Sequence, residues 1–458
     1  MKPSNLRYVI DSGFVKQKTY DPATGMDALL VVPISRAAAT QRAGRAGRTA
    51  SGQAFRLYSR ESFEQMEEDT VPEIQRSSLL GTVLSLKKMG INDIINFEFI
   101  DPPDPAMVKN ALKQLFLLEA IDDSGKLTTL GNEMSIFPLS PFLSRVLIAS
   151  SRKYECSREV VIIVAMLSVE EIFVSPRSTE KQMDADEKRR EFYHPSGDHM
   201  MLLNIFERYR DSGYSRDWCR DKYFNYRALS MAKSVRDQLR ELMAKHDLPL
   251  ISCRLKTYQV KDDGDRHKKK RRNSYQDIKY NAEKILESFS TSYYINLAKR
   301  HPHRPVFYHY ASATGPGSES IDSNSSLLAL HISPTSALHP DNKVVRADDL
   351  DWVTYHSVLY TNKALMKVVS KVKLEWVQER LSLFKKLATA NLDGSYGSNK
   401  SGSNILDNTN EDSDKVNSMV ADAQKVKDQD DEKKRKRLEA IEAARQRALA
   451  RKSITNQD

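Results

Sequence analysis

The octet QRAGRAGR at residues 41–48 constrains this chain more than any other stretch of its sequence. Ser35 is a good N-cap, and the alanine-rich run after it favours a helix that continues into the octet. On a helix Gln41, Arg45 and Arg48 stand at i, i+4 and i+7, so their side chains are predicted to share one face. Two permanently charged guanidiniums one turn apart suit a phosphate between them. A solvated surface is the commoner fate of an arginine pair, but the eight-residue pattern is more specific than a pair.

The octet has the form QRxGRxGR and resembles motif VI of superfamily 2 helicases. Two flanking segments, DSGF at 11–14 and SGQAFRLY at 51–58, resemble the DEAH-box RNA helicases in particular. The resemblance implies that Gln41 helps to place the water that attacks ATP, and that Arg45 and Arg48 are arginine fingers on the γ-phosphate. This agrees with the chemistry, because phosphoryl transfer spreads negative charge that a guanidinium stabilises.

The other parts of an ATP site are missing from the sequence. It contains no GxxxxGK[ST] loop, no Asp-Glu-x-His segment and no Ser-Ala-Thr segment. The chain is therefore predicted to begin inside the second RecA-like domain of such a helicase. ATP and Mg²⁺ would be held through a first RecA-like domain that the chain lacks, so we expect this chain alone to bind no cofactor and to hydrolyse no ATP.

Composition limits the partners and the compartment. The net charge of +10 indicates an anionic partner, for which nucleic acid is the leading candidate, although a basic tail on a neutral body would also account for it. Three widely spaced cysteines allow neither a disulfide framework nor a CxxC metal pair, which suits a reducing compartment. No apolar run is long enough to span a bilayer and no signal peptide is evident. A soluble, intracellular monomer without membrane contact is expected.

Residues 1–70 are assigned to the C-terminal part of the second RecA-like domain. The apolar run 6–10 predicts a buried parallel strand, and runs 14–20 and 26–34 predict a β-hairpin around a proline- and glycine-containing loop. In the resembled family a hairpin here separates bases of the bound strand, while an ordinary surface hairpin is the alternative. The candidate RNA-binding residues of this region are Lys16 and Lys18.

Helical periodicity dominates the middle of the chain. Residues 71–135 are predicted to form a winged helix, with apolar stripes at Leu79, Leu80, Val83 and Leu86 and at Met107, Ala111, Leu115 and Leu118. Few basic residues fall on its groove-reading helix, which argues against DNA binding, and the resemblance implies that this module is a structural brace. Residues 136–246 are predicted to form the family's helical ratchet bundle. Within it Asp198 is expected to cap a helix or lie in its first turn rather than form an acid–base pair with His199, and Trp218 and Tyr226 to pack in the core rather than stack on bases.

Short strands return in residues 247–387, which are assigned to an OB-fold with insertions at 262–276 and 313–326. Five strands are predicted, at 250–259, 306–311, 327–332, 352–360 and 366–372, with one helix at 281–298. The first insertion carries candidate RNA-binding or nuclear import residues, namely Lys268, Lys269, Lys270, Arg271 and Arg272. His301, His303 and His309 are closely spaced, but no cysteine or carboxylate cluster accompanies them, so no metal is expected.

The predicted fold is a multidomain α/β plus α plus β chain. It combines a partial RecA-like parallel sheet and hairpin, a winged helix, a ratchet bundle, an OB-like barrel, and a disordered basic tail over 388–458 that contains a marginal helix. The predicted function is the C-terminal part of an ATP-dependent RNA helicase that translocates on single-stranded RNA and remodels RNA or RNP complexes in splicing or ribosome biogenesis. The expected location is the nucleus or nucleolus, with a possible protein activator. The alternatives are an ATP-independent RNA- or partner-binding module and a winged-helix DNA-binding regulator.

Overall fold

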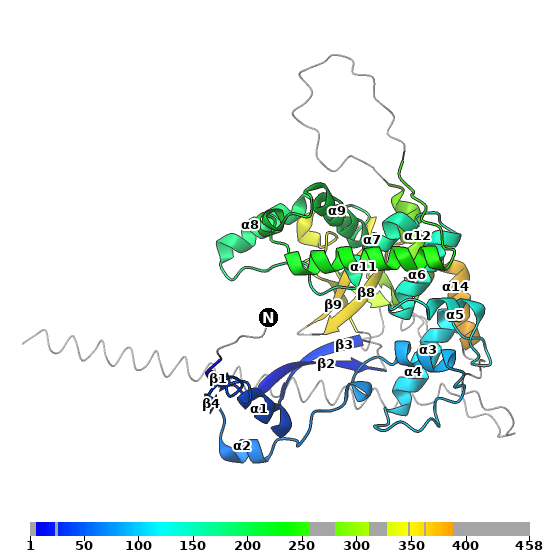
Figure 1. The fold of residues 1–458 in the computed structure, drawn as a ribbon. Helices are drawn as coiled ribbons and strands as arrows, with labels where there is room; N and C mark the ends of the chain where they lie inside the picture. Colours follow the sequence, from blue (N-terminus) through cyan, green and yellow to red (C-terminus); the bar gives the residue numbers. More distant parts are fainter. Residues whose placement is uncertain are drawn as a thin grey trace, which may run out of the picture. The chain divides into compact units, whose positions relative to one another are not determined.

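The computed structural model describes residues 6–22, 26–255, 280–310, 328–346, 349–360, 363–387, 390 and 392 of the chain (Figure 1). The chain divides into two units, residues 1–397 and 398–458. All the described residues belong to the first unit. The basic run at 268–272, the second insertion at 313–326 and nearly all of the predicted tail lie outside the described residues, so those predictions stand untested.

The N-terminal segment contains a small parallel sheet. Strand β1 (Tyr8–Asp11) pairs in parallel with β4 (Gln53–Arg56), which confirms a parallel strand near the run 6–10. The prediction that this strand is buried is wrong, because Tyr8 and Ile10 are exposed. The connection between them includes α1 (Arg36–Ala43), and α2 (Arg60–Glu64) follows. Ile10 lies opposite Phe55 and both side chains are exposed, by 72% and 50%. One face of this sheet is therefore apolar and uncovered.

The predicted hairpin is present and is held at two further places. Strands β2 (Phe14–Asp21) and β3 (Met26–Pro33) pair in antiparallel register. Close to the turn, β3 pairs in parallel with β8 (Trp352–Tyr360), a strand more than 300 residues later in the chain (Figure 1). On the other strand, Tyr20 donates its hydroxyl hydrogen to Asn110 Oδ1 at 3.0 Å. The hairpin is thus anchored to two later parts of the chain.

The predicted winged-helix region contains three α-helices and a short antiparallel bridge. Asp104 caps α4 by accepting from the amide of Ala106, and proline follows at the first helical position, where it is well tolerated. Gly90 follows α3 with φ +87°, a conformation that favours glycine. The predicted apolar stripes are buried, which confirms the helical periodicity. The elements are η1 (Glu73–Gln75), α3 (Leu80–Lys88), α4 (Pro105–Leu117), the bridge between Ile121 and Leu127, and α5 (Thr129–Met134).

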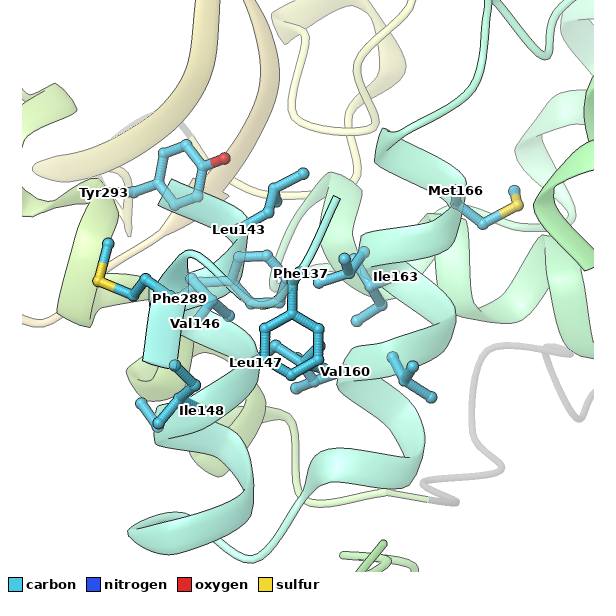
Figure 2. Close-up of a cluster of buried hydrophobic side chains, with 14 of the residues drawn as sticks. Phe137, Leu143, Val146, Leu147, Ile148, Val160, Ile163, Met166, Phe289 and Tyr293 are labelled. Carbon is cyan, nitrogen blue, oxygen red and sulfur yellow. The ribbon is translucent and has the colours of Figure 1, made fainter. Parts of the chain in front are cut away.

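The next helices form a bundle around a continuous apolar core. Figure 2 shows part of it, where Leu147 and Val160 lie beside Phe137. Nine of the eleven residues of α7 are buried, as its apolar run predicts. Trp218 packs among the rings of Phe192, Tyr209 and Phe224, as predicted. Tyr226 is exposed, so the prediction that it packs in the core is wrong. The helices are α6 (Pro141–Arg152), α7 (Ser157–Leu167), α8 (Thr179–Arg190), α9 (Asp198–Asp211), α10 (Arg216–Asp221), α11 (Tyr226–Lys245) and α12 (Ala282–Tyr293).

Five short strands close into a barrel. The pairings run β8–β5–β6–β7–β9 and return from β9 to β8. Its interior includes Phe307, Leu330, Val353 and Met366. Besides β8 the strands are β5 (Leu297–Arg300), β6 (Phe307–His309), β7 (Leu330–Ile332) and β9 (Ala364–Lys371), and η3 (Pro340–Asn342) precedes β8.

The prediction of the first barrel strand is wrong. The described residues 250–255 form no strand and make only a bridge between Arg254 and Tyr280. The first strand is instead β5, which was assigned to the end of a helix. The chain leaves α12 through the short turn η2 (Tyr294–Asn296), after which Leu297 and Ala298 are buried against β8. A strand of four residues is too short for its alternation to separate it from a helix end.

A C-terminal helix was not predicted. Helix α14 (Leu374–Leu387) follows the barrel and contacts α4 and α12. Arg380 on this helix and Arg145 on α6 both pair with Glu119, which follows α4. The helix therefore joins the bundle and the helical region before it.

Candidate functional site

The octet begins in α1 but leaves the helix halfway. Ser35 caps α1 as predicted, accepting from the amide of Ala38 at 3.1 Å. The helix ends at Ala43, and the next residues form turns in which the amides of Arg45 and Ala46 donate to carbonyls three residues earlier. The prediction that Gln41, Arg45 and Arg48 share one helical face is therefore wrong, since only Gln41 is helical. Glycine costs about 1 kcal/mol relative to alanine in a helix, so the glycines of the octet favour this early end.

The turn nevertheless leaves the three predicted site residues accessible. Gln41, Arg45 and Arg48 are all exposed. In the described part of the chain none of their side chains has a hydrogen-bond or ion-pair partner. The backbone between the two arginines is fixed, because Ala46 is buried and a Cβ at Gly52 would lie 2.3 Å from the Ala46 carbonyl oxygen. The turn thus presents two unpaired guanidiniums from a constrained backbone, an arrangement that suits an anionic ligand.

Arg42, the other arginine of the octet, contacts the segment between β1 and β2. Its Nη1 lies 2.6 Å from Oδ1 of Asp11, and its Nη2 donates to the carbonyl of Phe14 at 3.2 Å. Asp11 also accepts from the amide of Gly13 at 3.0 Å and from the hydroxyl of Tyr58 at 3.1 Å. One carboxylate therefore joins the three sequence segments DSGF, QRAGRAGR and SGQAFRLY. Sequence reasoning quoted all three segments but did not predict that they meet.

The pKa values of this cluster follow from its contacts. Burial by itself would raise the pKa of Asp11, but the Gly13 amide, Arg42 and Tyr58 outweigh it, and the net pKa is lowered. The pKa of Tyr58 is raised, by burial and then by its hydrogen bond to Asp11. Asp11 is therefore ionised at neutral pH and holds Arg42 as a charged pair.

The candidate RNA-binding residues Lys16 and Lys18 lie on the outer side of β2, and both are exposed. Lys18 lies close enough to His356 of the barrel to contribute to the lowered pKa of that histidine, after the larger effect of burial. Near the same end of the hairpin, Asn110 donates to the carbonyl of Pro22 at 2.6 Å, and Gln114 donates to the hydroxyl of Tyr20 at 3.0 Å. These contacts fix the orientation of the strand that carries the two lysines.

Asp198 lies in the first turn of α9, as predicted, and makes no hydrogen bond with His199. Its carboxylate accepts from the amides of Ala337 at 2.8 Å and Val369 at 2.7 Å. Nδ1 of His199 instead lies 2.7 Å from the hydroxyl oxygen of Ser370. Asp198 and His199 therefore form a buried joint between the bundle and the barrel rather than an acid–base site.

The close packing of this joint explains its glycine. Gly197 has φ +114°, and a Cβ there would lie 2.5 Å from the Cα of Ser370. Burial raises the pKa of Asp198 to about 6, although the Ser336 side chain and the two amides lower it. Burial lowers the pKa of His199 to about 3 and that of His356 to about 4.

The histidines considered for a metal make local contacts instead. His301 Nδ1 accepts from the amides of His303 and Arg304, and His309 Nε2 lies 2.9 Å from the carbonyl oxygen of Ile295. Among the described residues no group of three or more histidine, cysteine or acidic side chains could hold a metal ion. In the same part of the chain, no helix is both long and apolar enough to cross a bilayer.

Comparison with known proteins gives two matching families and a long relative. Residues 111–139 match the winged-helix part of the helicase associated domain (HA2), and residues 140–202 match its ratchet-like part. Over 385 residues, 84% of this chain, the sequence is 38% identical to the pre-mRNA-splicing factor ATP-dependent RNA helicase prp22 of Schizosaccharomyces pombe. The aligned region spans 29% of that relative's length. Together with the QRxGRxGR octet, these similarities show that the chain belongs to the DEAH-box RNA helicases and corresponds to the portion of them that carries the helicase-associated modules.

Proposed function

We propose that this chain is the C-terminal part of an ATP-dependent RNA helicase and that Gln41, Arg45 and Arg48 sense the γ-phosphate of ATP held by a partner RecA-like lobe. The observation that carries the proposal is the turn after α1, which exposes two guanidiniums without ion-pair partners in the described residues. ATP and Mg²⁺ would be held mainly by the partner lobe, which would supply the phosphate loop and the magnesium carboxylates. The arginines would stabilise charge on the transferred phosphoryl group.

The β1–β4 sheet supports this assignment. Parallel sheets are normally covered on both faces. Here α1 contacts β1, whereas Tyr8, Ile10 and Phe55 remain exposed. An uncovered apolar face on a parallel pair of strands is expected for a sheet that is completed by other parts of a RecA-like domain.

Single-stranded RNA is the proposed substrate. The net charge of +10 favours a polyanion, and the barrel resembles folds that bind oligonucleotides. The similar S. pombe helicase is a pre-mRNA-splicing factor, which favours splicing and hence the nucleus over ribosome assembly and the nucleolus. The ratchet and barrel would grip RNA while ATP turnover moves the lobes, with the winged helix as a brace. A monomer with a protein activator completes the proposal.

ATP turnover tests the proposal most directly. The 458-residue chain alone should show no RNA-stimulated ATP hydrolysis, whereas the same chain joined to the P-loop lobe of the S. pombe helicase should show it. In the joined protein Arg45→Gln should lower kcat about 1,000-fold, because an arginine finger contributes 10³–10⁵ in rate. Arg60→Gln, which removes a guanidinium from the exposed surface of α2, is the matched control and should keep full activity. Turnover by the chain alone, or full activity of Arg45→Gln, would contradict the proposal.

RNA binding separates this proposal from a DNA-binding regulator. The chain should bind single-stranded RNA more tightly than duplex DNA, with an affinity that falls as salt rises because counterions are released. Fluorescence anisotropy at several salt concentrations measures both. Tight RNA binding combined with an inactive joined protein would favour the ATP-independent binding module.

A further inference from the structure

The proposed function assigns no role to Arg42, the arginine of the octet that pairs with Asp11. The octet contains three arginines, and two of them are exposed without ion-pair partners in the described residues. Arg42 differs, because its guanidinium meets a carboxylate and a carbonyl that both lie in the segment between β1 and β2. Both of its terminal nitrogens are therefore engaged by acceptors of the protein, unlike those of Arg45 and Arg48 in the described residues.

Arg42 also lies at the start of the turn that carries the fingers. Its carbonyl accepts from the amide of Arg45 at 3.0 Å, so its backbone closes the first turn after α1. Its side chain is fixed on Asp11, a residue that is only 3% exposed and is itself held by Gly13 and Tyr58. At the other end of the turn, Ala46 is buried against Gly52.

The turn that carries Arg45 is thus held at two points, one on each side of this residue. One point is the Arg42–Asp11 ion pair and the other is the contact of Ala46 with Gly52. Arg45 and Arg48 have long side chains whose position depends on the backbone beneath them. A displacement of about 1 Å in a catalytic group can lower a rate about 100-fold.

From this geometry we infer that Arg42 and Asp11 are positioning residues, which orient the turn bearing Arg45 and Arg48 without touching the nucleotide themselves. Tyr58 supports them by donating to the second oxygen of Asp11. The inference rests on the proposed function, since it assigns to Arg42 a role that acts only through the two proposed fingers.

Hydrogen exchange of the 458-residue chain tests the positioning without any ATP chemistry. In Arg42→Gln and in Asp11→Asn, the amides of Arg45 and Ala46 should exchange about 10-fold faster, because the turn opens locally more often. Arg36→Gln removes a guanidinium from the same helix, one that pairs with Glu68 across 3.7 Å, and it should leave these amides unchanged. The amide of Ala38, bound to Ser35, reports whether α1 is still folded. Unchanged exchange at Arg45 and Ala46 in both variants overturns the inference.

Kinetics of the protein joined to the P-loop lobe test whether Arg42 acts through Arg45 and Arg48. Arg42→Gln should lower kcat about 100-fold with a change of less than about 3-fold in KM for ATP. Because Arg42 acts through both fingers, the triple variant Arg42→Gln/Arg45→Gln/Arg48→Gln should be no slower than the double variant Arg45→Gln/Arg48→Gln. Arg42→Lys keeps the charge but not the two-point contact, so it should recover part of the rate.

The outcomes separate the two hypotheses. If Arg45→Gln has full activity, the proposed function fails, whatever Arg42 does. If Arg45→Gln is impaired but Arg42→Gln behaves like Arg36→Gln, the proposed function stands and the positioning role fails. If Arg42→Gln lowers the rate further when both Arg45 and Arg48 are already replaced, Arg42 acts independently of the fingers, which also contradicts the inference.

Discussion

The N-terminal segment and the bundle–barrel joint each depend on one buried aspartate, but the two sites are built differently. Asp11 and Asp198 are 3% and 2% exposed, and each accepts from backbone amides. Asp11 also faces the guanidinium of Arg42, and its pKa is lowered. Asp198 has no cation among the groups that hold it, and burial raises its pKa to about 6.

The surroundings of Asp11 are more exposed to solvent than those of Asp198. Around Asp11 the strands are short, and β4 is exposed along its whole length. Around Asp198 the joint is sealed by α9, β9 and the apolar core of the bundle. A carboxylate near an open surface can keep a charged partner at little cost, whereas a sealed one must be satisfied by neutral donors. The N-terminal segment therefore keeps an exposed surface, whereas the joint is sealed from solvent.

The largest loss of unfolding free energy is expected for Asp198→Ala. This change leaves the amides of Ala337 and Val369 buried without an acceptor, so the free energy of unfolding should fall by about 4 kcal/mol. Urea unfolding monitored by far-UV circular dichroism measures it. Asp217→Ala, on the exposed surface of α10, is the control and should change stability by less than about 0.5 kcal/mol. A similar small loss in Asp198→Ala would mean that the joint is not closed.

A smaller effect should come from the apolar side chains of the two regions. Leu147→Ala removes a fully buried side chain from the bundle core and should cost about 3 kcal/mol of unfolding free energy. Ile10→Ala removes a side chain that is 72% exposed and should cost less than about 0.5 kcal/mol. It should also reduce self-association at high protein concentration, measured by light scattering, because less apolar surface is exposed. Equal destabilisation by both changes would refute the contrast between an open segment and a closed core.

The smallest effect should appear as a pH dependence of the joint. The pKa of His199 is lowered to about 3 in the folded chain, against 6.5 for an ordinary histidine, so only the unfolded state gains its proton as pH falls below 6.5. Stability is therefore lost on acidification, by about 2 kcal/mol for this residue between pH 7 and pH 5. His199→Gln should lack that part of the loss, and His246→Gln, at the end of α11, should retain it.

Asp198 acts in the opposite direction in the same range, because a raised pKa favours the folded state at low pH and that contribution is lost as pH rises through about 6. It is present in all three proteins, so it does not affect their difference. Urea unfolding at pH 5 and pH 7 gives the comparison. An identical pH dependence of wild type and His199→Gln would mean that this ring is not sealed in the joint.

Local signals predicted much of the fold because they act within a few residues. The cap at Ser35, the hairpin and the buried run of α7 are all present where the sequence indicated them. The same reasoning failed where local signals compete or are short. The helix through the octet stops at Ala43, and the first barrel strand is β5.

Sequence by itself determined the family, the arginine motif and the helical periodicity, since each is written in residues close together in the chain. Only the tertiary structure decided that Arg42 pairs with Asp11 across 31 positions, that Asp198 binds an amide 171 positions away, and that β3 joins β8. Such contacts depend on which surfaces the packed helices and strands bring together. No periodicity or spacing encodes them, because a buried polar group needs a partner but does not specify where in the chain that partner lies.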